Sequence, residues 1–166
     1  MIPENVLPIH WQNMLGCAFF IIASVTDALD GFFARRFGLG TALGAFLDPV
    51  ADKLMVSAAL IVLLAFGRVE MLIALIIIGR EITVTALREW MAKIGESGKV
   101  KVNWVGKIKT ISQMVAIPML LFYEPLFGLN IKLIGTVLIY IAAILTLYSM
   151  FVYLRAAAPY FDKDPK

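Results

Sequence analysis

Long apolar stretches constrain the fold of this chain more than any other feature. Five of them follow one another, separated by short segments that carry proline, glycine or charged residues. We predict one helix in each stretch, over about residues 11–36, 41–66, 71–93, 104–123 and 131–156. Each helix would be long enough to cross a hydrocarbon core of roughly 30 Å. The sequence therefore predicts an all-α fold, a polytopic transmembrane bundle of five helices.

The composition favours the same fold class. Of the 166 residues 61% are hydrophobic, and the mean hydropathy is +0.87. Soluble domains are only roughly 45–50% apolar. We expect a single membrane domain over residues 1–166, with a short N-terminal segment at 1–11 and a polar tail at 157–166. The one cysteine, Cys17, excludes a disulfide framework within the chain.

Basic residues predict how the bundle is oriented. Most of them would lie on one side of the membrane, in the segment between the first two helices, in and around residues 94–103, and in the C-terminal tail. The excess of lysine and arginine marks the cytoplasmic side of a membrane protein. We therefore expect a multi-pass protein with these three segments in the cytoplasm and the N-terminus outside.

Four carboxylates interrupt the first two apolar stretches. Asp27 and Asp30 are three residues apart, and Asp48 and Asp52 are four apart, so each pair shares one face of its helix. We predict two antiparallel helices whose acid pairs face one common space near the turn that joins them. Both pairs would lie toward the cytoplasmic end of the bundle.

Acids in such apolar surroundings need positive partners, because an unpaired buried carboxylate is costly. Two divalent cations, Mg²⁺ or Mn²⁺, would neutralise all four, since hard cations prefer oxygen ligands. A pair of metal ions held in this way is typical of phosphoryl transfer. The structural alternative is ion pairing of the acids with Arg35, Arg36 and Lys53.

The same stretch matches the pattern D-x2-D-G-x2-A-R-x8-G-x3-D-x3-D at every fixed position. The matching residues are Asp27, Asp30, Gly31, Ala34, Arg35, Gly44, Asp48 and Asp52. This pattern resembles the signature of the CDP-alcohol phosphatidyltransferases. The resemblance implies a bundle of six helices, and the present chain would begin after the first of these.

The resemblance also implies roles for the matching residues. The four aspartates would hold the two cations against the pyrophosphate of CDP-diacylglycerol, and Asp52 would also serve as the general base. The nucleotide and pyrophosphate would be bound at Thr26, Gly31, Ala34, Arg35 and Gly44.

A second group of charges lies farther along the chain. Arg80 and Arg88 belong to the third helix, where they would either pair with acids such as Glu81 and Glu89 or bind a phosphate. Lys107 and Lys109 are two residues apart at the start of the fourth helix, so they point to opposite sides. We expect Lys107 to enter the cavity, with binding of anionic lipid headgroups as one role for Lys109.

The blocks REITVTALREW and GKIKT, around these basic residues, resemble those of the bacterial phosphatidylglycerophosphate synthases. That resemblance implies sn-glycerol 3-phosphate as the acceptor, bound through its phosphate by Arg80, Arg88 and Lys107, and a bacterial inner membrane with the active site toward the cytoplasm. We expect a homodimer and no nucleic-acid partner. Three alternatives remain open: another acceptor such as inositol phosphate or serine, a metal or ion transporter, and an inactive scaffold or fragment.

Overall fold

The computed structural model describes residues 7–37, 42–95 and 104–161. At positions 31, 33–35, 42–49 and 105 it describes the backbone alone. The described residues form five long helices and one short 3-10 helix, and they contain no β-strand beyond an isolated bridge between Leu126 and Leu129. The helices are α1 (Ile9–Phe37), α2 (Ala42–Ala65), α3 (Met71–Lys93), α4 (Trp104–Phe122), α5 (Ile131–Ala157) and η2 (Ala158–Tyr160). The predicted all-α bundle is confirmed, and each predicted helix is found with its ends shifted by at most a few residues.

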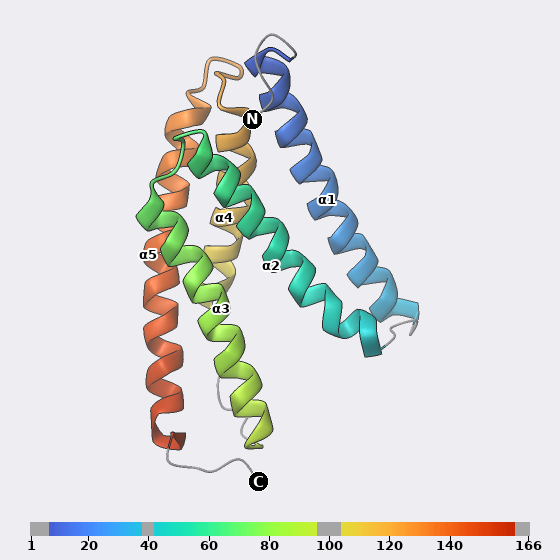
Figure 1. Ribbon diagram of the computed structural model, residues 1–166, viewed down its shortest axis with the longest axis vertical. Coiled ribbons are helices and arrows are strands. Elements are labelled where there is room, and N and C mark those ends of the chain that lie inside the picture. Colours follow the sequence, from blue (N-terminus) through green and yellow to red (C-terminus); the bar gives the residue numbers. More distant parts are fainter. Residues whose placement is uncertain (1–6, 38–41, 96–103, 162–166) are drawn as a thin grey trace.

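Local sequence explains where the helices turn. The tight turn between α2 and α3 includes Gly67, whose positive φ of 66° is readily adopted only by a residue without Cβ. Asn130 caps α5, because its side-chain oxygen accepts a hydrogen bond of 3.0 Å from the backbone N–H of Leu133. These short connections make consecutive helices antiparallel (Figure 1). Helices α1, α3 and α5 therefore end at one end of the bundle, as the charge pattern predicted.

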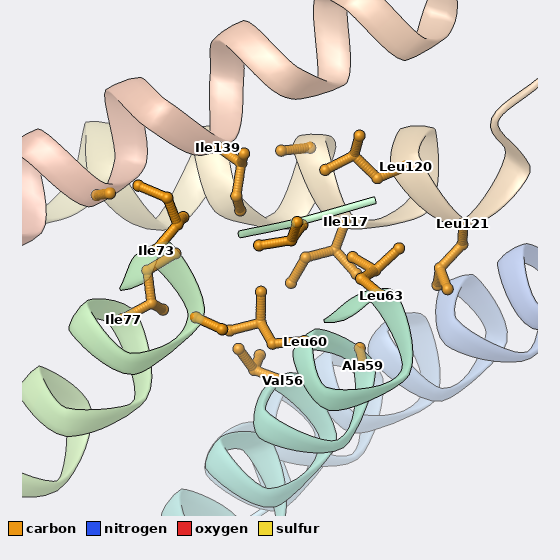
Figure 2. Close-up of a cluster of buried hydrophobic side chains, with 14 of the residues drawn as sticks. Val56, Ala59, Leu60, Leu63, Ile73, Ile77, Ile117, Leu120, Leu121 and Ile139 are labelled. Atoms are coloured by element: carbon orange, nitrogen blue, oxygen red, sulfur yellow. The ribbon is translucent and has the colours of Figure 1, made fainter. Parts of the chain in front are cut away.

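The core lies where all five helices meet. Leu60 and Leu63 of α2, Ile77 of α3 and Ile117 of α4 are fully buried. They pack with the nearly buried Ile139 of α5 in one cluster (Figure 2). Helix α4 runs along α5 over most of its length, while α1 and α2 diverge from α3 and α5 toward the end where α1 and α3 finish (Figure 1). The packed core thus lies nearer the opposite end of the bundle.

A polar cluster closes that opposite end. The guanidinium of Arg68, in the α2–α3 turn, donates hydrogen bonds of 3.0 and 2.7 Å to the carbonyls of Leu120 and Leu121. These carbonyls belong to the last turn of α4, where the helix itself offers them no partner. Arg68 also donates to the side chain of Asn13 in α1, and Asn13 donates in turn to Glu124. The cluster holds α1, the α2–α3 turn and the end of α4 together. The helices therefore diverge at the other end of the bundle.

The outer surface of the bundle is apolar. Large side chains such as Phe19 on α1, Leu75 on α3 and Ile144 on α5 are more than 60% exposed. Two of the described segments, Ile9–Asp30 and Ile131–Tyr160, are long and apolar enough to cross a membrane by their length and composition. An apolar exterior around a packed interior is what lipid surroundings require.

Two glycines offer a matched test of the helix packing. Gly135→Ala should lower the midpoint of thermal unfolding, because the new Cβ would lie 3.0 Å from Cγ of the buried Leu120. Overpacking of this kind costs about 1–3 kcal/mol. Gly79→Ala is the control, since its Cβ would meet nothing within 4 Å and alanine is the better helix former by up to about 1 kcal/mol. Equal shifts of the midpoint in the two variants, measured in the same detergent, would contradict the close contact between α4 and α5.

Candidate active site

The four acids lie on α1 and α2, in the part of the bundle where these two helices diverge from the others. Asp27 is half-buried and Asp30 is exposed, and both are on α1. Asp52, on α2, is also half-buried, and the charge of Asp27 acts on its carboxyl group. One acid from each predicted pair is therefore near enough for the two charges to act on each other. Asp48 lies on α2 one turn before Asp52, where only the backbone is described.

The residues predicted to bind the nucleotide are less fully described. Thr26 is an exposed residue of α1. Gly31, Ala34 and Arg35 lie on α1 and Gly44 lies on α2, but beyond their helical backbone they are outside the described part of the structure. Their predicted roles stay predictions.

The acids have the right chemistry for hard divalent cations, because all four offer carboxylate oxygens. Asp27 and Asp52 bring like charges together from two helices, an arrangement that a cation would relieve. Among the side chains that the structure describes, no group of three or more acids, histidines or cysteines is close enough to hold a metal ion. The side chain of Asp48 is not among them, so the donor set fits a metal chemically while its geometry is described only in part.

A cavity of about 280 Å³ opens beside Asp52, among α2, α3, α4 and α5. Its wall carries more positive than negative groups: Lys53, Arg80, Arg88 and Lys109 against Asp52 and Glu81. Both predicted arginines line it, together with Gln113 and Tyr153. A concave, mainly basic wall next to a carboxylate can bind a small anion and place it beside a base.

The two arginines are held by α5. Arg80 is buried, with 8% of its surface exposed, and its Nη2 donates a hydrogen bond of 2.7 Å to Oγ of Ser149. Arg88 donates from Nη2 to the hydroxyl of Tyr153. The ring of Tyr153 also lies near both guanidinium groups, with its centroid 5.9 Å from Cζ of Arg80 and 5.0 Å from Cζ of Arg88. Both arginines therefore contact α5 through Tyr153, although only Arg80 is buried and Arg88 is exposed.

Glu81 joins the third and fourth helices. Its Oε1 lies 3.3 Å from Nη1 of Arg80 and also accepts a hydrogen bond from Nζ of Lys109. Pairing of the arginines with acids, the alternative to phosphate binding, is therefore found for Arg80, whose acidic partner is Glu81. Arg88 is held by a phenol instead, so its full positive charge is available to an anion in the cavity.

The structure corrects the choice between the two lysines of α4. Lys109 lines the cavity and is only 2% exposed, whereas Lys107 is exposed and its Nζ lies 5.2 Å from the centroid of the Trp104 ring. Two residues along a helix correspond to about 200° of rotation, so only one of the pair can face the core. The preference for Lys107 in the cavity was wrong, and burial also excludes binding of lipid headgroups as the main role of Lys109.

Sequence reasoning missed three polar residues of the site: Glu81 as a bridge, Ser149 and Tyr153. Ser149 and Tyr153 are four residues apart on α5, so they share one face of an otherwise apolar helix. That spacing was the available signal. It has meaning only once α5 is known to pack against α3.

Known proteins resemble this chain over most of its length. A sequence model of the family described as CDP-alcohol phosphatidyltransferase matches residues 2–148. Proteins named CDP-diacylglycerol–glycerol-3-phosphate 3-phosphatidyltransferase from Pectobacterium atrosepticum and Yersinia enterocolitica are 46% and 48% identical to the chain over 153 residues. A protein of the same name from Shigella flexneri is 44% identical. Each alignment covers 91% of this chain and 82% of the relative. With the acid signature on α1 and α2 and a family match over most of its length, the chain belongs to the CDP-alcohol phosphatidyltransferase family.

Proposed function

We propose that this membrane protein transfers the phosphatidyl group of CDP-diacylglycerol to sn-glycerol 3-phosphate, giving phosphatidylglycerophosphate and CMP. This reaction belongs to phospholipid synthesis. The observation that carries the proposal is the basic cavity beside Asp52, because it offers an anion site next to a carboxylate of the family signature. Relatives that are 44–48% identical are named for this pair of substrates.

The acid half of the site would bind the donor. Asp27, Asp30, Asp48 and Asp52 would hold two Mg²⁺ or Mn²⁺ ions, which when bound neutralise the charge that develops on the pyrophosphate. Around the donor, Thr26, Gly31, Ala34, Arg35 and Gly44 would bind the nucleotide and pyrophosphate. The diacyl chains would stay in lipid along the apolar exterior throughout the reaction.

The basic half would bind the acceptor. Arg80, Arg88 and Lys109 would contact its phosphate, since guanidinium groups match phosphate oxygens and the ammonium adds a point charge. Lys107 takes no part in this proposal, because its side chain points away from the cavity. Asp52 is the acid of the family signature that lines the cavity shared by these basic groups, and in this proposal it takes the proton from the attacking hydroxyl. The oxygen then attacks the β-phosphoryl group, and CMP leaves.

The site would lie on the cytoplasmic face of a bacterial inner membrane. The helix ends nearest to the cavity carry most of the basic residues, which favours that side. A multi-pass arrangement of all five helices fits the apolar exterior, and we also propose a homodimer.

The alternatives differ in what the cavity should bind. Serine has no phosphate, so two arginines and a lysine would contribute little to its binding. An inositol phosphate would bind to them through its phosphate. A metal or ion transporter would place its acids near the middle of the membrane. Here Asp27 and Asp30 lie in the second half of α1, ten and seven residues before its end at Phe37, which favours an enzyme that is open to the cytoplasm.

Release of CMP from CDP-diacylglycerol, with a panel of acceptors, tests the proposal. We expect purified protein to release CMP with sn-glycerol 3-phosphate in the presence of Mg²⁺ or Mn²⁺, and to stop when the ions are chelated. Preference for inositol phosphate or serine would overturn the acceptor. Metal flux into proteoliposomes without any CMP release would favour the transporter.

A further inference from the structure

We propose that Ser149 is a positioning residue that fixes Arg80 in the orientation needed to bind the acceptor phosphate. This inference rests on the proposed function and extends it to α5, a helix outside the acid signature. Ser149 lies on α5, 5% exposed, and accepts a hydrogen bond of 2.7 Å from Nη2 of Arg80. Its Oγ faces α3 across the helix interface.

Five other hydroxyl groups in the described part of the bundle behave differently. Ser24, Thr83, Thr85, Thr110 and Thr136 each donate a hydrogen bond to the backbone carbonyl four residues earlier in their own helix. That local bond is the usual choice for serine and threonine in helices. The bond described for Ser149 instead crosses to another helix and ends on a charged group, so it contributes to the site and not only to its own helix.

Arg80 needs such a partner because the other hydrogen bond described for it is long and ends on a shared oxygen. Nη1 of Arg80 lies 3.3 Å from Oε1 of Glu81, and the same oxygen accepts a hydrogen bond from Lys109. A long contact to a neighbouring residue of the same helix leaves the guanidinium plane free to tilt. The bond to Ser149 supplies a second fixed point, on a different helix.

The same guanidinium also keeps an unused donor. Nε of Arg80 is buried and has no hydrogen-bond partner among the residues that the structure describes. The Arg80 side chain lines the cavity, and a buried donor without a partner is costly unless a ligand satisfies it. Nη1 and Nη2 each direct one N–H group to Glu81 and Ser149, so their second N–H groups and Nε–H are the donors left for the oxygens of a bound anion. Ser149 therefore acts on the acceptor through Arg80 and need not touch it.

The test compares Ser149→Ala with a matched variant on the same helix. Thr146 lies three residues before Ser149 and is fully buried, and its hydroxyl has no partner in the described part of the chain. Thr146→Val thus removes a buried hydroxyl from α5 without touching Arg80. The KM for each substrate and kcat are measured for both variants by CMP release from CDP-diacylglycerol.

Ser149→Ala is expected to raise the KM for sn-glycerol 3-phosphate about tenfold, as loss of a hydrogen bond to a charged group does. Its kcat and its KM for CDP-diacylglycerol should change less than about twofold, since the donor site is not involved. Thr146→Val should match the wild type, and Ser149→Thr, which keeps the hydroxyl, should restore most of the acceptor affinity. An unchanged acceptor KM in Ser149→Ala, or an equal rise in Thr146→Val, would overturn the proposal.

Direct binding of inorganic phosphate to the full chain in detergent separates this inference from the proposed function. If the wild type releases no CMP with any acceptor, the proposed function fails. The inference still stands in that case if Ser149→Ala weakens phosphate binding about tenfold while Thr146→Val does not. Equal phosphate affinity in the wild type and Ser149→Ala would overturn the inference, whether or not the protein releases CMP.

Discussion

Asp27→Asn is expected to reduce CMP release by about a thousandfold or more at every Mg²⁺ or Mn²⁺ concentration. The change keeps the shape of the side chain and removes one negative ligand from a set that would hold two divalent cations. Such ions supply several kcal/mol of charge stabilisation in phosphoryl transfer, and 1.36 kcal/mol corresponds to a factor of about ten in rate. The half-buried Asp27 acts electrostatically on Asp52 of the neighbouring helix, so its loss also disturbs the proposed base.

Glu89→Gln is the control for this substitution. Glu89 is an exposed acid on α3, outside the cavity lining, so its amide variant should keep near-normal activity. Stabilisation of the protein by Mn²⁺ in a thermal unfolding assay provides a second readout, and it should be lost in Asp27→Asn alone. Near-normal turnover in Asp27→Asn would contradict the two-metal assignment and favour pairing of the acids with basic residues.

The second large effect separates the two lysines of α4. Lys109→Met is expected to raise the KM for sn-glycerol 3-phosphate about a hundredfold, whereas Lys107→Met should stay within about twofold of the wild type. The reason is placement: Lys109 is buried in the cavity wall beside Glu81, and Lys107 is exposed beside Trp104. Loss of one charged contact to a phosphate costs about 2–3 kcal/mol, which accounts for the factor.

Removal of Lys109 alone would also leave Glu81 with only its longer contact to Arg80. Breaking a buried pair is destabilising by itself, by about 3–5 kcal/mol where the remaining charge is uncompensated. The double variant Lys109→Met/Glu81→Gln removes both charges, so it should recover much of the thermal stability but not the acceptor affinity. If the double variant recovers the acceptor affinity as well, Lys109 has a structural role only. If Lys107→Met gives the larger KM effect, the sequence-based preference for Lys107 is restored.

The helices of this fold could be predicted from the sequence because each apolar stretch is long and is bounded by polar, proline or glycine residues. The rotation of each helix about its axis could not be predicted as easily. Helix α4 shows the reason. Its buried residues Ser112, Gln113, Ala116, Ile117 and Leu120 follow the helical repeat, and Lys109 continues that row toward the N-terminus. Extending the apolar face backward would have identified Lys109 and not Lys107.

The acid half of the proposed site could be predicted from the sequence because its members lie within one stretch of two adjacent helices. The basic half was accessible only in part. Arg80 and Arg88 stand out as charges in an apolar helix, but their partners Ser149 and Tyr153 come from a helix more than sixty residues later. A serine and a tyrosine in an apolar helix have many structural roles, and only the packing of α3 against α5 selects this one.

The central claim is that acids on α1 and α2 and basic groups on α3 and α4 form one site for phosphatidyl transfer. Its most direct test follows labelled sn-glycerol 3-phosphate into lipid, with purified protein, CDP-diacylglycerol and Mg²⁺. The account predicts one labelled phosphatidylglycerophosphate for each CMP released, with both products lost in Asp27→Asn. CMP release without label in the lipid, or labelled lipid formed equally well by Asp27→Asn, would contradict it.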